Sequence, residues 1–293
     1  MFIGGYSESS RPSNSQAVKP PPASRMSRGR TCNLEPATCN RTAARLDSSR
    51  AALWPSFFLL LLLAAGGLRG QDAPHYLPPG QPDAARLLAP PPLPGSAEEA
   101  ADLAQVVAIH RACTTNQAAL AFSEKKFSLT NFAPAIGEFF QLANLPKTEA
   151  FFARVQSEAA AVTDLAKDHW KRPRPYTVDP SLASGKLEKS FGYPSGHATE
   201  AMVLALLLAD LFPERRDAVL AIGRDIGWHR VWIARHYPTD IYAGRVFAQA
   251  IVQEMKVNPA FQRDFAAAKA EIAAELQAAA EPADGPSRAE PAE

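Results

Sequence analysis

The chain has 293 residues, enough for one large or two ordinary domains, and 46% of them are hydrophobic. Its formal net charge is only +1, but residues 1–70 carry nine Lys/Arg against three Asp/Glu, whereas the remainder carries 22 against 27. The body is therefore mildly acidic, which gives no support to nucleic-acid binding.

The first part of the chain has the pattern of an export signal. An apolar run from Leu53 to Ala65 follows Arg41, Arg45 and Arg50 and precedes small residues. The run is short for a membrane span, and a basic lead before such a run is typical of a secretory signal peptide. We expect residues 1–70 to be lead and signal, and the mature protein to be periplasmic without stable membrane insertion. An uncleaved N-terminal anchor helix is the alternative.

A proline-rich arm, residues 71–95, separates this lead from the body. Proline removes backbone donors and favours extended structure, so the arm is expected to be a tether or a wrapping segment. Ser96 and Glu99 then form a capping-box pattern that starts a helical domain over residues 96–280. The acidic, Pro- and Ala-rich residues 281–293 are expected to be a disordered tail.

The body reads as helical throughout, with apolar residues at three- and four-residue spacing and almost no alternating strand pattern. The fold class is therefore all-α, a single compact helical domain. The predicted helices cover residues 97–122, 148–170 (capped by Thr148), 195–212, 214–228, 238–255 and a last one capped by Asn258-Pro259.

Two cations of interest, Lys167 and Arg174, lie near the end of the second long predicted helix. Lys167 and Arg174 are seven residues apart, close to two helical turns, so they can reach the same side if the helix persists or is gently broken. Together they could hold two oxygens of one phosphate. Taken alone, the segment is also compatible with a solvated basic loop.

The next segment, Pro194-Ser195-Gly196-His197, precedes an apolar helix. Gly196 lets the backbone approach a ligand closely, and the helix start presents free N–H groups and the positive end of its dipole. An anion would bind there with the Ser195 hydroxyl as a further donor. His197 would then stand beside the anion, suited to proton transfer. An ordinary turn is the alternative for the tetrapeptide.

The third segment combines a cation with a histidine–carboxylate pair. Arg230 offers a planar guanidinium suited to phosphate oxygens. His236 and Asp240 are four residues apart and can share a helix face, so that the carboxylate binds one ring nitrogen and leaves the other free to attack. A solvated His–Asp pair is common by itself, but the conjunction of the three segments indicates a phosphate-attacking site.

The three segments resemble a known set of motifs: Lys167-x6-Arg174-Pro175, Pro194-Ser195-Gly196-His197 and Arg230-x5-His236-x3-Asp240. They are similar to the signatures of the type-2 phosphatidic acid phosphatase superfamily, specifically its soluble branch, the class A bacterial non-specific acid phosphatases. The resemblance covers roughly residues 75–275. It departs at His229, where the family usually has serine.

The resemblance implies a phosphatase/haloperoxidase-type helical fold and a metal-independent phosphomonoesterase without cofactor. By the family's pattern, His236 is the nucleophile, Asp240 fixes its tautomer, and His197 is the acid and then the base. Small phosphate monoesters are the expected partners, and the chain could form a homo-oligomer. The phosphate-binding groups would be Lys167, Arg174, Ser195, Gly196 and Arg230.

Three other functions share parts of this pattern. A vanadium haloperoxidase would hold vanadate in a similar oxyanion site. A membrane lipid phosphatase needs several spans, and this chain offers at most one. An inactive phosphate-binding or envelope-interaction protein would keep the cations without turnover.

Overall fold

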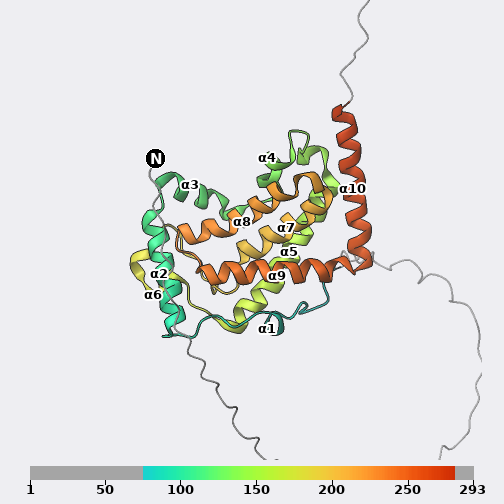
Figure 1. Cartoon of the computed structure of the whole chain (residues 1–293). Helices are drawn as coiled ribbons and strands as arrows, with labels where there is room; N and C mark the ends of the chain where they lie inside the picture. The colour runs from blue at the N-terminus through green and yellow to red at the C-terminus, as the bar shows by residue number, and fades with distance from the viewer. Residues whose placement is uncertain (1–74, 281–293) are drawn as a thin grey trace, which may run out of the picture. The chain divides into compact units, whose positions relative to one another are not determined.

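The structure, a computed structural model, describes residues 75–280, and over that range it contains helices and connecting turns but no strand (Figure 1). The all-α prediction is confirmed. The predicted lead with its signal peptide and the predicted tail lie outside the described residues. The α-helices are α1 (Ala84–Leu87), α2 (Ala97–Ala112), α3 (Thr115–Ser123), α4 (Ala133–Ile136), α5 (Pro146–Trp170), α6 (Pro175–Val178), α7 (Gly196–Leu211), α8 (Arg216–Trp232), α9 (Pro238–Lys256) and α10 (Pro259–Ala280).

Helix α7 is the centre of the domain, packed against α5, α8 and α9. It is apolar on almost all sides, and eleven of its sixteen residues are buried, as expected of a helix enclosed by others. Glycines bring the neighbours close to its first turn. A Cβ on Gly227 of α8 would lie 2.9 Å from the Ala198 Cβ, and one on Gly244 of α9 would lie 2.8 Å from the Ser195 carbonyl oxygen. Small residues thus bring α8 and α9 close to the start of α7.

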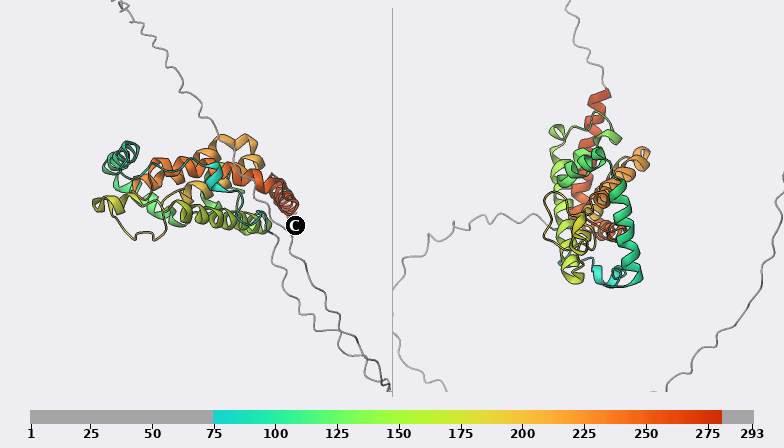
Figure 2. Two further views of the ribbon diagram at one scale, coloured as in Figure 1. Left: turned by 90° about the horizontal axis from the view of Figure 1, so that it is seen from below. Right: turned by 90° about the vertical axis from the view of Figure 1, so that its left-hand side faces the viewer.

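Two helices close the ends of this bundle. Figures 1 and 2 show α2 across one end and α10 across the other. The arm before α2 packs on the domain: the Tyr76 amide donates to the Glu158 carboxylate of α5, and the Tyr76 hydroxyl donates to Asp264 of α10 at 2.7 Å. Tyr76 and Leu77 are buried, so the start of the arm belongs to the core.

Two predicted caps are confirmed. The Ser96 hydroxyl accepts from the Glu99 amide at 3.1 Å and starts α2. The Asn258 side-chain oxygen accepts from the Ala260 amide at 2.8 Å and starts α10. Both residues offer a short side chain to amides that lack a partner in the first turn.

The prediction of one helix over residues 97–122 is wrong. The segment breaks at Cys113 and Thr114, both in extended conformation, and α3 starts anew. Thr114 and Gln117 form a capping box in which each side chain binds the other's backbone, which makes a fresh helix start locally favourable.

Two further helix boundaries differ from the predictions. Helix α5 begins at Pro146, so Thr148 lies inside its first turn; the Thr148 amide and hydroxyl donate to Glu271 of α10. Helix α8 runs to Trp232 instead of ending at residue 228, and this extension places Arg230 on its last turn.

Among residues 75–280, none of the helices combines the length and the apolar character required to span a bilayer.

Candidate active site

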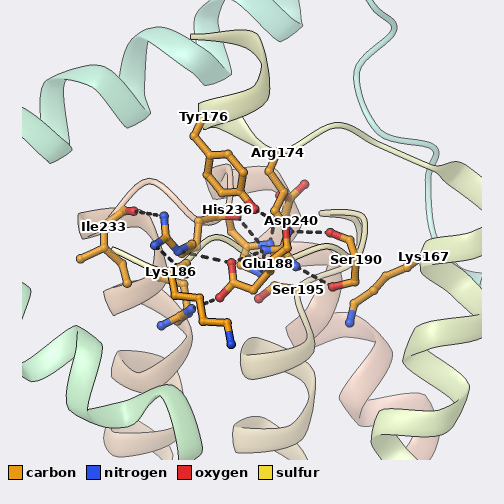
Figure 3. Close-up of polar contacts among 12 residues, drawn as sticks. Lys167, Arg174, Tyr176, Lys186, Glu188, Ser190, Ser195, Ile233, His236 and Asp240 are labelled. Carbon is orange, nitrogen blue, oxygen red and sulfur yellow. Dashed lines mark hydrogen bonds and ion pairs between the residues drawn. The ribbon is translucent and has the colours of Figure 1, made fainter. Parts of the chain in front are cut away.

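The three motifs converge on the start of α7. Lys167 comes from the last turn of α5, Arg174 from the N-cap of α6 and Ser195 from the N-cap of α7. Arg230 comes from the last turn of α8, and His236 lies two residues before α9. All five are buried. Figure 3 shows Lys167, Arg174 and Ser195 around His236.

Lys167 and Arg174 reach this site across a break in the helix, which is one of the two possibilities that their spacing left open. Helix α5 ends at Trp170, where Lys171 takes a left-handed conformation with φ of 50°. The prolines that follow prevent the helix from continuing. Arg174 therefore arrives from the turn that follows the end of α5, as the N-cap of α6.

Nε2 of His236 carries a lone pair that faces Arg174. Its Nε2 lies 3.0 Å from Nη1 of Arg174. Because a guanidinium can only donate, Nε2 must accept, and the ring proton therefore sits on Nδ1, 3.3 Å from Oδ2 of Asp240. His236 precedes α9, whereas Asp240 lies in its first turn, so the pair meets across a helix start rather than along one face.

The environment keeps this imidazole neutral. Burial lowers the pKa of His236 well below its ordinary value, and the charges of Arg174, Arg230 and Lys167 lower it further. A neutral ring with its Nε2 lone pair available is the form that can attack phosphorus.

Asp240 is held by a buried ion-pair chain that the sequence analysis missed. Arg172 donates to Oδ1 of Asp240 at 2.5 Å and to Oδ2 of Asp102 at 2.8 Å. The Thr239 hydroxyl also donates to Asp102. Burial raises the pKa of Asp240, and Arg172 together with the Tyr237 amide opposes the rise. Asp102, on α2, is thus linked to Asp240 and His236 through Arg172.

A second missed residue, Glu188, sits among the arginines. Its Oε1 lies 2.6 Å from Nη2 of Arg230, and its Oε2 lies 3.4 Å from Nη1 of Arg174 and 3.3 Å from Nε of Arg235. Figure 3 shows this carboxylate in front of His236. A glutamate between motifs has no distinguishing pattern, so only the fold reveals it.

The N-terminus of α7 forms the remaining wall. The Ser195 amide donates to the Asp240 carbonyl at 3.0 Å, and its hydroxyl accepts from the Ala198 amide at 3.3 Å. A Cβ on Gly196 would lie 3.2 Å from Nζ of Lys167. Glycine at that position therefore lets the lysine approach the helix start, as a phosphate-binding site requires.

His197 is half-buried and lies beside the positive charge of Arg230. Burial of the ring, together with the Arg230 charge, lowers its pKa to about 3, while backbone groups of Lys125 and Glu124 oppose the shift. Its Nε2 is buried and has no hydrogen-bond partner within residues 75–280. Phe127 packs on the ring at 5.5 Å between centroids.

His229 is occupied by contacts of its own. Its Nδ1 lies 2.8 Å from Oε2 of Glu124, and its ring stacks on Trp232 with centroids 4.0 Å apart. His229 and Glu124 are both buried. The position where the family usually has serine thus joins α8 to the end of α3.

Across residues 75–280, no three His, Cys, Asp or Glu side chains lie close enough together to hold a metal ion. The cations of the three motifs lie around His236 together with the carboxylates of Asp240 and Glu188.

Comparison with known proteins agrees with this geometry. Residues 153–260, which carry all three motifs, match the family model described as the PAP2 superfamily. This part of the chain is a PAP2 superfamily domain.

Curated relatives of this PAP2 protein are phosphatases. It is 29% identical over 194 residues to the acid phosphatase of Zymomonas mobilis, covering 63% of this chain and 74% of that one. It is also 29% identical over 210 residues to the non-specific acid phosphatase of Providencia stuartii, covering 68% and 85%. The resemblance to bacterial non-specific acid phosphatases is confirmed, and the protein is a phosphatase of this superfamily.

Among solved structures, the transmembrane PAP2 type phosphatidylglycerolphosphate phosphatase from Bacillus subtilis matches with a TM-score of 0.42 and 18% identity, over 59% of this chain and 89% of that one.

Proposed function

We propose that this phosphatase hydrolyses phosphate monoesters through a phosphohistidine formed on His236, without a metal ion. The observation that carries the proposal is the tautomer of His236, with Nε2 accepting from Arg174 and Nδ1 facing Asp240. In-line attack by Nε2 forms the N–P bond as the bond to the ester oxygen breaks, and Asp240 stabilises the positive charge that develops on the ring.

The cations around His236 supply the charge that phosphoryl transfer needs. Lys167, Arg174 and Arg230 are close enough to act on its pKa. With the Ser195 hydroxyl and the Gly196 amide, they would hold the three non-bridging oxygens. Fixed cations in this role make a divalent ion unnecessary for charge neutralisation.

His197 is assigned to proton transfer. In the free enzyme the pKa of His197 lies at about 3, chiefly because of burial and the Arg230 charge. A phosphate dianion bound among the same cations offsets their field and favours the imidazolium. His197 then protonates the leaving alkoxide, and afterwards, as a base, it takes a proton from the water that hydrolyses the phosphohistidine.

A rapid-quench experiment tests this mechanism. Wild-type enzyme mixed with a labelled phosphate monoester should trap phosphate in an acid-labile, base-stable linkage, and His236→Ala should trap none while keeping its unfolding temperature. Label recovered on a serine would refute the assignment. Exhaustive EDTA treatment should leave turnover unchanged, and loss of activity that zinc or magnesium restores would refute metal independence.

We also propose that the enzyme is exported to the periplasm. The support is the Arg-flanked apolar run from Leu53 to Ala65. N-terminal sequencing of periplasmic protein should find a start between about Gly66 and Ala73. Full-length protein retained in the membrane fraction would contradict cleavage.

A further inference from the structure

Glu188 occupies the arginine cluster as an anionic ligand would. Its two carboxylate oxygens pair with Arg174, Arg230 and Arg235 at 2.6 to 3.4 Å. Two of these arginines are assigned above to the substrate's phosphate. A carboxylate and a phosphate offer the same kind of oxygen acceptor to a guanidinium, so they would compete for the same donors.

The cluster has more donor capacity than Glu188 uses. The buried N–H groups of Arg230 are not all used: its Nε has no hydrogen-bond partner within the described residues, and Oε2 of Glu188 makes ion-pair contacts only, without a well-aligned hydrogen bond. Buried polar atoms are normally paired. A tetrahedral dianion carries more acceptor oxygens and more charge than one carboxylate, and it would engage these donors better.

The backbone that carries Glu188 is anchored independently of its side chain. Arg235 donates to the carbonyls of Ser184 and Lys186, and Arg174 donates to the Ser190 carbonyl at 2.7 Å. The Tyr176 hydroxyl donates to the Glu188 carbonyl itself at 2.9 Å. The side chain keeps 23% exposure, so a change of rotamer can move the carboxylate into solvent while these anchors stay in place.

We propose that Glu188 is an internal competitor for phosphate: its carboxylate fills the arginine cluster in the free enzyme, and the phosphate group of a ligand displaces it. The inference builds on the proposed function, because it uses the same cations. Glu188 would prevent repulsion among three buried arginines while the site is free. It would also weaken the binding of every phosphate ligand, including the product, and so favour product release.

Binding of inorganic phosphate tests this directly, by titration calorimetry on wild type and on Glu188→Gln. The apparent dissociation constant of a site equals its intrinsic value divided by the fraction of molecules in which the site is free. For a site that is about nine-tenths blocked, Glu188→Gln should lower the dissociation constant for phosphate about tenfold. The exposed Glu149→Gln, on the first turn of α5, removes the same charge elsewhere and should leave the constant unchanged.

Two results would overturn the proposal. A dissociation constant that is unchanged or higher in Glu188→Gln overturns the proposal, because Glu188 would then stay bound and orient the arginines for phosphate. If Glu188→Gln fails to fold, Glu188→Asp keeps the charge but shortens the side chain, and an unchanged or weaker phosphate affinity there overturns it too. A wild type that binds phosphate without hydrolysing esters would refute the proposed function and leave this inference standing.

Discussion

Two buried arginines of one site, Arg172 and Arg230, are held in opposite ways. Arg172 lies between the carboxylates of Asp240 and Asp102 at 2.5 and 2.8 Å, and although burial lowers its pKa, the two aspartates outweigh burial and raise it. Burial lowers the pKa of Arg230, the neighbouring arginines add to the shift, and Glu188 only partly opposes it. Nε of both arginines lacks a partner among the described residues, so the contrast lies in their carboxylates: Arg172 has two that are buried, whereas Arg230 has only the partly exposed Glu188.

The difference separates structural from functional charge. A buried cation that is paired with two buried carboxylates fixes its neighbours, here His236 through Asp240, and has little charge left to give a ligand. A buried cation with free donors and a depressed pKa costs stability until an anion binds. The interactions around His236 and Asp240 are therefore in place before a ligand binds. The cations assigned to phosphate binding gain their full set of interactions only when the ligand is present.

The largest expected effect is a loss of stability when Arg172 is replaced. Arg172→Met leaves Asp102 and Asp240 buried without their shared cation, which should lower the free energy of unfolding by about 3–5 kcal/mol. Denaturant unfolding measures this, with Arg172→Lys as the variant that keeps the charge but loses the two-armed contact. A variant as stable as wild type would show that the Asp102–Arg172–Asp240 ion pairs do not stabilise the fold, and it would remove the contrast with Arg230.

The matched substitution at Arg230, which is assigned to phosphate binding, should lower activity rather than stability. Arg230→Met removes a cation whose partner Glu188 is partly exposed and has two other arginines, so the free energy of unfolding should change by about 1 kcal/mol or less. Loss of one preorganised donor should lower kcat/KM about 10²–10³-fold. A large loss of stability with little loss of kcat/KM would place Arg230 among the structural charges.

The role of His197 can be isolated with a series of leaving groups. His197→Asn should lower kcat for alkyl phosphates by about 10²–10⁴-fold and for p-nitrophenyl phosphate by much less, since a good leaving group needs little help from an acid. Equal losses across the series would mean that His197 serves binding or structure.

The smallest effect expected is a pH dependence of stability. The pKa of His197 is lowered from 6.5 to about 3, so between these pH values the unfolded chain binds a proton that the folded chain does not, and stability falls as pH falls. The wild type should therefore lose stability relative to His197→Asn by up to about 1.4 kcal/mol per pH unit within this window.

His236 and Asp240 also titrate with shifted pKa values, but both are present in the two proteins, so the difference between the two curves reports on His197. Chemical unfolding at pH 7, 6 and 5 gives these curves. Parallel curves would indicate that His197 keeps an ordinary pKa in the folded enzyme.

Residue type and spacing along the chain predicted which side chains lie close together around His236. His236, Asp240, Arg230 and Lys167 were identified from spacing, because phosphate attack requires cations, a nucleophile and a carboxylate, and few segments supply all three. The caps at Ser96 and Asn258 were also readable, because a cap is a contact between neighbours in the chain.

Contacts between distant segments were decided by the tertiary structure. Arg172 looks like any member of a basic run, yet it meets Asp102, 70 positions away, whereas Glu188 meets Arg230 at a separation of 42. The sequence by itself therefore determined which chemistry the chain carries, since that depends on residue type. Only the packing of α2, α7, α8 and α9 decided which charges are satisfied and which stay available, because burial and pairing depend on neighbours that chain order does not specify.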